Sequence, residues 1–235
     1  MPGSLADRRR WMRHGTTLFL QAAEFNDHAL AQRSALPGWS RKHVIAHVAA
    51  NADALGNLIH WAATGQPTPM YSSPGERAAG IEHGSLLPAA DLQAWLRRSA
   101  GALEDASSRL GTDHWQAPVV TAQGRTVPAS EVPWLRAREV YVHAVDLAVD
   151  LSFADLPADF MATLCDDMIT KRSAGPGPAV LLEAADTHTR WELPGNGKPV
   201  AVSGPLGDLT AYLAGRAHGL AAGGGGPVPA LPPWL

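Results

Sequence analysis

Glu139 and His143 are the two residues whose types and spacing best predict chemistry in this sequence. In a helix, residues four apart lie on one face, with their Cβ atoms about 5–6 Å apart. A carboxylate and an imidazole placed in this way can bind one divalent metal ion such as zinc, whose catalytic sites keep one coordination position open. A surface ion pair has the same spacing, and Arg136 and Asp146 extend the polar stripe. The pair is therefore a candidate metal site that needs a further ligand from elsewhere in the chain.

His47 is the leading candidate for that further ligand. It lies beside Val44 and Val48, apolar residues at helical spacing, which indicates a position near the interior of a helical bundle. Bundles build metal sites from inward-facing side chains of neighbouring helices. His43, four residues earlier, is an alternative ligand, and spacing alone does not choose between the two. A packed or surface histidine without a ligand role is the more common case.

Arg216 and Cys165 are the other residues with chemical potential. Arg216 follows Ala214-Gly215 in a part of the chain with few basic residues, and a guanidinium can hold a carboxylate through two parallel hydrogen bonds. An ordinary surface arginine is the alternative. Cys165 has no basic neighbour in the sequence, which predicts a packed and unreactive thiol.

Four long helices in residues 1–152 are predicted to position the candidate metal site. The second helix begins after Ser40, a typical capping residue, and the fourth has Ser130 as a cap and Pro133 in its first turn. The first, third and fourth helices are expected over roughly residues 4–32, 88–110 and 129–151. The connections at residues 65–87 and 111–128 are predicted to be irregular, and connections of this length in a compact domain are often functional.

Residues 153–235 are predicted to form a second, smaller domain. Just over half of the chain's 23 Gly and 19 Pro lie there, which marks a boundary near residue 152. The pattern predicts a helix, three short strands bounded by turn residues, a last helix and a Gly- and Pro-rich tail. The expected ranges are 156–173 for the helix, 179–184, 188–193 and 198–203 for the strands, and 205 to about 220 for the last helix. This order is typical of an α+β domain.

Charge and composition exclude several classes of protein. The net charge is −3, so no basic surface for nucleic acid is indicated, and no apolar run reaches the roughly 18 residues of a membrane span. Arg8, Arg9 and Arg10 precede an apolar stretch that is too short for an export signal. A single cysteine excludes a disulfide within the chain and fits a reducing compartment. We therefore expect a cytoplasmic protein that binds neither nucleic acid nor a membrane.

Several stretches together resemble the mycothiol-dependent maleylpyruvate isomerase family, within the DinB-like superfamily. Residues 36–47 (LPGWSRKHVIAH) and 138–147 (REVYVHAVDL) resemble the family's two metal-binding segments. Residues 60–71, 121–131 and 202–216 are similar to more specific parts of the family, and the similarity extends to the C-terminal Pro-Pro-Trp-Leu. The resemblance thus covers nearly the whole chain.

This resemblance implies a fold and a set of ligands. It implies a DinB-like four-helix bundle in residues 1–152, followed by a small α+β domain in residues 153–235. It implies zinc held by His47, Glu139 and His143, with His47 rather than His43 as the histidine from the second helix. It also implies that Arg216 reaches into a cleft between the domains.

The implied activity is the cis–trans isomerisation of maleylpyruvate to fumarylpyruvate in gentisate degradation, with mycothiol as the thiol cofactor. A thiolate, favoured by zinc, would add to the alkene, the resulting single bond would rotate, and elimination would restore the double bond. Arg216 is the expected catalytic residue, since it would offset the charge of the substrate carboxylates or of the enolate. The residues that contact mycothiol, and any role of Arg125, stay open. A monomer is expected. The alternatives are another mycothiol-dependent S-transferase and a non-enzymatic DinB-like metal-binding protein.

Overall fold

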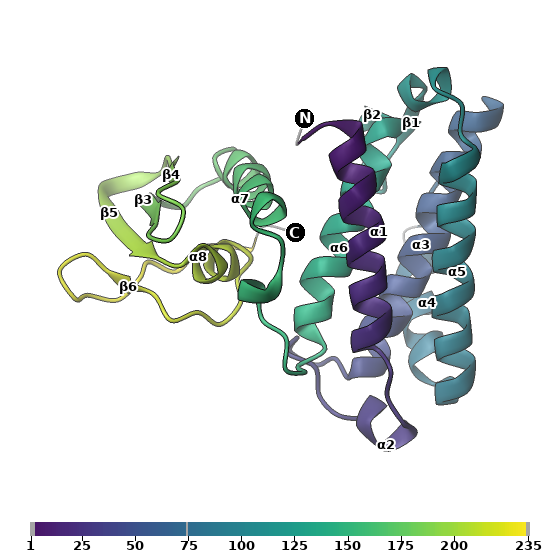
Figure 1. Ribbon diagram of the computed structural model, residues 1–235, viewed down its shortest axis with the longest axis horizontal. Helices are drawn as coiled ribbons and strands as arrows, with labels where there is room; N and C mark the ends of the chain where they lie inside the picture. The colour runs from purple at the N-terminus through teal and green to yellow at the C-terminus, as the bar shows by residue number, and fades with distance from the viewer. Residues whose placement is uncertain (1–2, 74, 234–235) are drawn as a thin grey trace. The chain divides into compact units, whose positions relative to one another are not determined.

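The computed structural model describes residues 3–73 and 75–233. The chain divides into two compact units, one from Gly3 to Asp150 and one that begins at Leu151 (Figure 1). Trp234 and Leu235, the end of the stretch that resembles the family, lie outside the described residues. The α+β fold class predicted from the sequence is confirmed, because one unit is mainly helical and the other combines helices with a sheet.

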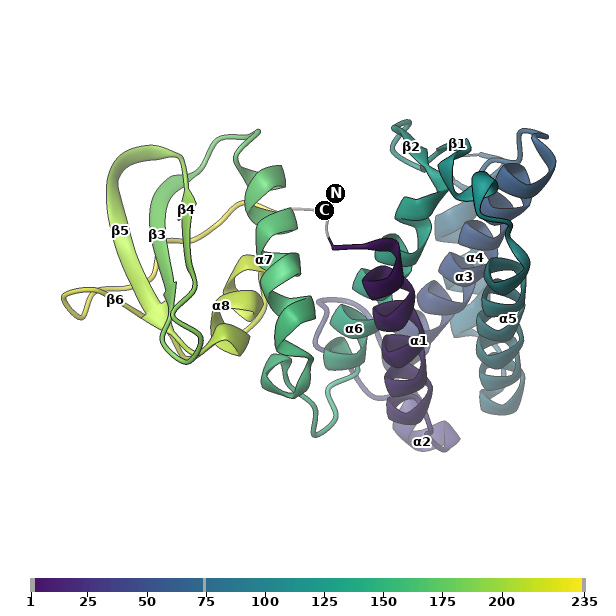
Figure 2. The ribbon, with the colours of Figure 1, turned by 45° about the horizontal axis from the view of Figure 1, so that its top comes forward.

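Four long helices make up most of the first unit, and Figure 2 shows them side by side. They are α1 (Leu5–Ala22), α3 (Arg41–Thr64), α5 (Ala89–Arg109) and α6 (Val132–Asp146). Helix α1 packs against α6, and α3 packs against both α5 and α6. The core between them is apolar and includes Leu55, Leu58 and Ile59 of α3, which are fully buried. The helix that carries His47 therefore lies at the centre of the bundle.

Two glycines allow helices to approach closely around the candidate site. A Cβ atom on Gly15 of α1 would lie 2.7 Å from Val140 Cγ2 of α6. A Cβ atom on Gly84 of α4 (Glu76–Ser85) would lie 2.6 Å from the Cβ of Ala46 on α3. Since real Cβ atoms do not come so close, larger residues at these positions would push α1 from α6 and α4 from α3. The Gly84 contact brings α4 next to the residue that precedes His47.

The predicted first helix over residues 4–32 is wrong in its second half. Helix α1 ends at Ala22, and a short helix α2 (Asp27–Leu30) follows. The Asn26 side chain accepts a hydrogen bond from the Ala29 N–H at 2.9 Å, so it caps a new helix and does not continue the old one. The third helix, predicted over 88–110, is confirmed by α5.

The two connections predicted to be irregular contain regular elements. Helix α4 occupies Glu76–Ser85 in the first. The second holds a 3₁₀ turn, Asp113–Gln116, and an antiparallel hairpin of β1 (Pro118–Val120) and β2 (Thr126–Pro128). These elements are short, so hydrophobic periodicity could not identify them. Gly124, with a φ of 75°, provides the left-handed residue that the hairpin turn needs.

Helix α6 is shorter at both ends than the predicted 129–151. A 3₁₀ turn at Ala129–Glu131 precedes it, so Glu131 stands at the N-cap in place of Ser130, while Pro133 does lie in the first turn. At its other end α6 stops at Asp146, and the carbonyls of Leu147 and Ala148 accept hydrogen bonds from the Arg41 side chain, each at 2.7 Å. A tertiary contact therefore ends this helix.

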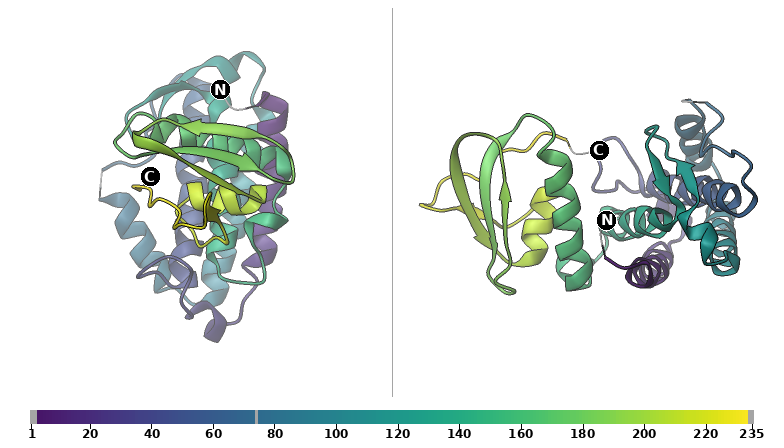
Figure 3. Two further views of the ribbon diagram at one scale, coloured as in Figure 1. Left: turned by 90° about the vertical axis from the view of Figure 1, so that its left-hand side faces the viewer. Right: turned by 90° about the horizontal axis from the view of Figure 1, so that it is seen from above.

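The second unit has two helices on one side of a four-stranded sheet (Figure 3). The strand order is β4-β3-β5-β6, with β3 and β5 parallel and the other pairs antiparallel. The helices are α7 (Ala158–Arg172) and α8 (Leu206–Leu213), and a 3₁₀ turn at Phe153–Asp155 precedes them. The strands are β3 (Pro178–Ala184), β4 (Arg190–Leu193), β5 (Asn196–Gly204) and β6 (Ala221–Ala222).

The sequence predictions for this unit are mostly confirmed, with two corrections. The helix over 156–173 and the three strands are present with shifted ends. The last helix, expected to reach about Leu220, ends at Leu213, because Gly215 turns the chain with a φ of 70°. Arg216 therefore follows the helix. The short strand β6, which was not predicted, precedes the Gly-rich stretch of the tail and pairs with β5. Among the described residues, no helix is long and apolar enough to cross a membrane.

Candidate metal centre

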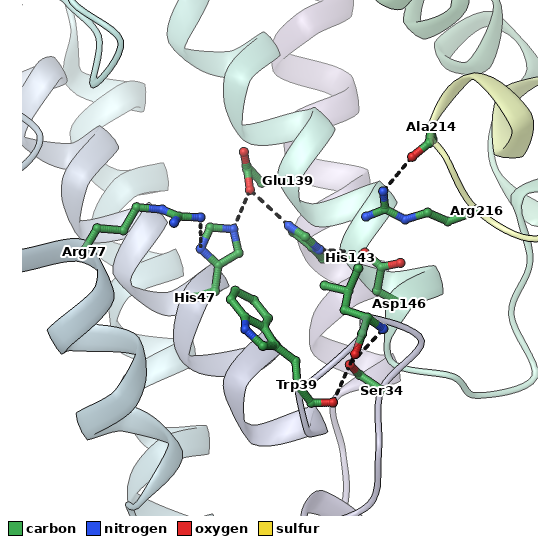
Figure 4. A network of polar contacts seen from close by, with 10 residues as sticks. Ser34, Trp39, His47, Arg77, Glu139, His143, Asp146, Ala214 and Arg216 are labelled. Carbon is green, nitrogen blue, oxygen red and sulfur yellow. Dashed lines mark hydrogen bonds and ion pairs between the residues drawn. The ribbon is translucent and has the colours of Figure 1, made fainter. Parts of the chain in front are cut away.

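Helices α3 and α6 bring three candidate ligands together inside the first unit (Figure 4). His47 comes from α3, and Glu139 and His143 come from successive turns of α6. Arg136, fully buried one turn before Glu139, braces the two helices: its Nη1 donates to the Val48 carbonyl at 2.7 Å and to an Asn51 side-chain oxygen at 3.0 Å. Arg136 therefore belongs to the interface of the two helices, not to a solvated stripe.

The distances within the cluster are short. His47 Nε2 lies 2.8 Å from Glu139 Oε2, and His143 Nε2 lies 3.4 Å from the same oxygen. The two imidazole rings are perpendicular, with centroids 4.8 Å apart. Each of the three residues offers one ligand atom, and these atoms lie within 4.8 Å of one another. Two imidazole nitrogens and one carboxylate oxygen are a donor set that zinc accepts, so the cluster fits this metal.

The surroundings of the cluster shift the pKa values of all three groups. Burial lowers the pKa of His47 more than its hydrogen bond to Glu139 raises it, which favours a neutral imidazole. Burial would raise the pKa of Glu139, but the hydrogen bonds of His143 and His47 outweigh it and hold this pKa well below its usual value. Burial would lower the pKa of His143, but Asp146 and then Glu139 raise it to about 9. Glu139 is therefore the anionic centre of the cluster.

Asp146 is a member of the site that the sequence analysis placed only on a polar stripe. It is fully buried, and its Oδ2 accepts a hydrogen bond from His143 Nδ1 at 2.8 Å. A carboxylate in this position fixes the ring orientation and leaves Nε2 directed at Glu139 in the cluster. Its spacing of three residues from His143 was the available signal, but only burial distinguishes this contact from a surface ion pair.

His43 and His47 have different surroundings, although spacing alone left both open as ligands. His43 lies in the first turn of α3, where its Nδ1 accepts a hydrogen bond from the Ser40 N–H at 3.2 Å and lies 2.7 Å from Ser40 Oγ. Its ring also stacks on Trp39, with centroids 6.2 Å apart. His43 thus caps the helix, and His47, one turn later, is the histidine in the metal-ligand cluster.

Arg77 and Tyr71 reach the cluster from α4 and the segment before it, and the sequence analysis identified neither. Arg77 Nη2 lies 3.5 Å from His47 Nδ1 (Figure 4). Burial raises the pKa of the Tyr71 hydroxyl, while the positive charge of Arg77 opposes this rise. These residues lie in or next to the connection that was expected to be functional because of its length.

The remaining candidates are not among the three residues of the cluster. Arg216 belongs to the second unit, and its Nη1 donates to the Ala214 carbonyl at 2.6 Å. Arg125 pairs with Glu131 at 3.1 Å, next to the first turn of α6. Cys165 is buried in the second unit 3.4 Å from Thr210 Oγ1, and burial raises the pKa of its thiol to about 12. This thiol is therefore protonated at neutral pH, and it is not an activated nucleophile.

Family models account for most of the chain. Residues 11–148 match the mycothiol maleylpyruvate isomerase N-terminal domain, and residues 155–233 match the C-terminal domain of the same family. The chain belongs to this family. No curated protein sequence matches the chain.

Two crystal structures are similar to this member of the mycothiol-dependent maleylpyruvate isomerase family. One is of the mycothiol-dependent maleylpyruvate isomerase, and the other is of a mutant of it in which alanine replaces a histidine. Each is 39% identical in sequence, with a TM-score of 0.93, and the match covers 99% of this chain and 98% of that chain. The resemblance found at residues 36–47 and 138–147 is therefore confirmed, and an enzyme is favoured over a non-enzymatic metal-binding protein.

Proposed function

We propose that this protein is a mycothiol-dependent maleylpyruvate isomerase, which converts maleylpyruvate to fumarylpyruvate. The observation that carries this proposal is 39% identity over 99% of the chain to an enzyme of that description. The convergence of two histidines and one glutamate in the first unit supports it independently, because a thiol-dependent reaction of this kind benefits from a metal that favours the thiolate.

In this proposal, zinc is held by His47, Glu139 and His143. The support is the donor set itself, which has ligand atoms within 4.8 Å of one another. Zinc would favour the thiolate of mycothiol, and this thiolate can add reversibly to the alkene so that the former double bond can rotate. Glu139 contributes one negative charge to the site, so a dication bound there would keep a net positive charge.

The protein's own residues would orient the ligands and bind the substrate. Asp146 holds the Nδ1 proton of His143 and so keeps Nε2 directed at the cluster. Trp39 lies against His47, with ring centroids 5.7 Å apart, and restricts the rotation of that imidazole. Arg216 is proposed as a catalytic residue that binds a carboxylate or the enolate oxygen of the substrate. The support for Arg216 is the sequence resemblance around it and the chemistry of its guanidinium.

The deciding experiment measures isomerisation directly. Zinc-loaded protein is mixed with maleylpyruvate, with and without mycothiol, and the formation of fumarylpyruvate is followed by absorbance. We expect turnover only with mycothiol, and we expect the thiol to be recovered at the end. Turnover without thiol, or none with it, would contradict the isomerase. Consumption of one thiol per substrate would instead identify an S-transferase.

Two variants test the proposed roles of His47 and Arg216. We expect His47→Ala to lose zinc, whereas Arg216→Ala should keep zinc but lose most of its turnover. Arg190→Ala is the matched control, because Arg190 is an exposed residue of the same unit that pairs with Glu183 at 2.9 Å. Full zinc content in His47→Ala would remove His47 from the site, and an unchanged rate in Arg216→Ala would remove Arg216.

The molecular context is also part of the proposal. We infer a cytoplasmic monomer with domains at residues 1–152 and 153–235 that binds small molecules and neither nucleic acid nor membranes. The net charge of −3 and the buried Cys165 support this view, and the two compact units divide next to the proposed boundary. Light scattering during gel filtration tests the monomer, and limited proteolysis of the full chain tests the boundary.

A further inference from the structure

The guanidinium of Arg77 is next to a nitrogen of His47 that would not bind the metal. His47 Nε2 faces Glu139 Oε2 at 2.8 Å and points into the cluster, whereas Nδ1 faces Arg77 Nη2 at 3.5 Å. With Nε2 carrying the proton and donating it to Glu139, Nδ1 is an acceptor, and Arg77 can donate to it. The two contacts are therefore compatible for one tautomer of the imidazole only.

Binding of zinc to His47 would reverse the roles of the two nitrogens. A neutral imidazole that binds a metal through Nε2 carries its proton on Nδ1. Nδ1–H and the guanidinium of Arg77 would then be two donors next to each other. Metal-bound histidines usually donate this proton to a carboxylate, a carbonyl or water, and Asp146 has that role for His143.

We propose that Arg77 and the Nδ1–H of His47 together bind a carboxylate of the substrate. This inference rests on the proposed function, because the substrate of such an isomerase carries two carboxylates. A guanidinium is the group best suited to bind a carboxylate through two hydrogen bonds, and a neighbouring imidazole N–H adds a third donor. Arg77 is therefore a substrate-binding residue, which positions the alkene beside the metal.

The structure holds Arg77 where this role requires it. Gly84 seats α4 closely against Ala46 of α3. The Arg77 residue as a whole is exposed, so a ligand can reach it from solvent, while its guanidinium extends to the buried His47.

The segment before α4 is tied to α3 because Asn57 Nδ2 donates to the Pro69 carbonyl at 3.2 Å. The Glu76 carboxylate accepts a hydrogen bond from the Ser72 N–H and steadies the start of α4.

The test measures ligand binding separately from turnover. Maleate, which shares with maleylpyruvate the cis alkene and the carboxylate attached to it, is titrated by calorimetry into zinc-loaded wild-type protein and into Arg77→Gln and Arg77→Lys. We expect the dissociation constant of maleate to rise about 10- to 100-fold in Arg77→Gln, because a charge-assisted pair of hydrogen bonds is lost. The dissociation constant of Arg77→Lys should lie between those of the wild type and Arg77→Gln, since lysine keeps the positive charge but lacks the two parallel N–H donors of the guanidinium. Zinc content should not change.

Arg97→Gln is the matched control, because Arg97 is an exposed arginine of the same unit on α5, 3.9 Å from Glu24. It should bind maleate as the wild type does. In turnover assays, Arg77→Gln should raise KM more than it lowers kcat. Unchanged maleate binding in Arg77→Gln, loss of zinc from this variant, or no maleate binding by the wild type would each overturn the proposal. A wild-type protein that binds maleate through Arg77 but does not isomerise maleylpyruvate would leave the carboxylate site standing and contradict only the proposed function.

Discussion

The two histidines of the candidate metal centre have opposite partners on their outer nitrogens. His143 Nδ1 faces the carboxylate of Asp146, whereas His47 Nδ1 faces the guanidinium of Arg77 (Figure 4). Asp146 is fully buried and comes from the same helix as His143, while Arg77 is exposed and comes from the separate helix α4. We call His143 and Asp146 the α6 side of the site, and His47 and Arg77 the α3–α4 side. On the α6 side the protein itself supplies the partner of the outer histidine nitrogen, whereas on the α3–α4 side Arg77 is a donor that a ligand can contact.

The two sides of the site are therefore suited to different roles, one to orienting a metal ligand and the other to binding a substrate. A preorganised ligand needs its orienting partner in place before the metal arrives, which the buried Asp146 provides. A substrate needs groups that solvent can reach, and Arg77 is an exposed residue. His143 and Asp146 are three residues apart in the sequence, whereas His47 and Arg77 are 30 residues apart.

The largest expected effect comes from removing the negative charge that Asp146 places next to His143 on the α6 side. Asp146→Asn keeps the size of the side chain and removes its charge, so it weakens the orientation of His143 and the basicity of its Nε2. We expect zinc affinity to fall about 10- to 100-fold, as found for other partners of metal-binding histidines. Competition with a chromophoric chelator measures it. Asp150→Asn, an exposed carboxylate just after α6, is the control. Equal zinc affinity in wild type and Asp146→Asn would remove the contrast between the two sides.

A second effect is expected from pH in protein stripped of metal by a chelator. The pKa of His143 in the folded protein is about 9, above the ordinary value of 6.5, because Asp146 and Glu139 outweigh the effect of burial. The folded state therefore binds more protons than the unfolded state between these two values. This stabilisation is fully present below about pH 6.5 and is lost as the pH rises through about 9. One unit of pKa difference corresponds to about 1.4 kcal/mol, so we expect the free energy of unfolding to fall by roughly 2–3 kcal/mol over this range.

Urea unfolding at pH 6.5 and pH 9.5 measures this change, with His143→Gln as the control that should lack it. Zinc-loaded protein should lack it as well, because metal on Nε2 replaces the titrating proton. A metal-free wild type that gains stability toward pH 9.5 would show that the α6 side does not hold a protonated His143.

The sequence predicted the α6 side of the site better than the α3–α4 side, and the reason is physical. Glu139 and His143 are recognisable because four residues of helix place them on one face. His47 needed the resemblance to be chosen over His43, since a three-dimensional contact with Glu139 distinguishes them. Arg77 lies in a segment rich in Gly, Ser and Pro, whose helix α4 depends on packing against α3 at Gly84. No local pattern records such a contact.

Prediction of the fold from the sequence has the same limit, because long-range contacts leave no local pattern. The strands of the second unit were predicted because turn residues bound each of them, and the long helices were predicted from their apolar periodicity. The end of α6 was missed because its cause lies elsewhere: Arg41 binds the carbonyls that follow α6, and it precedes Leu147 by 106 residues in the sequence. Local signals therefore predict the elements, whereas contacts between elements set some of their limits.

The smallest expected effect tests whether the α3 side depends on His47 alone. His43 lies one turn before it and caps α3 through the Ser40 N–H. His43→Ala should therefore reduce the free energy of unfolding by about 0.5–1 kcal/mol, the usual cost of a lost helix cap, and should leave zinc content and the KM for maleylpyruvate unchanged. Urea unfolding and metal analysis measure the two outcomes, with His47→Ala beside it as the variant expected to lose zinc. Loss of zinc from both variants would mean that the first turns of α3 act as one unit, and that the capping histidine is not separate from the metal centre.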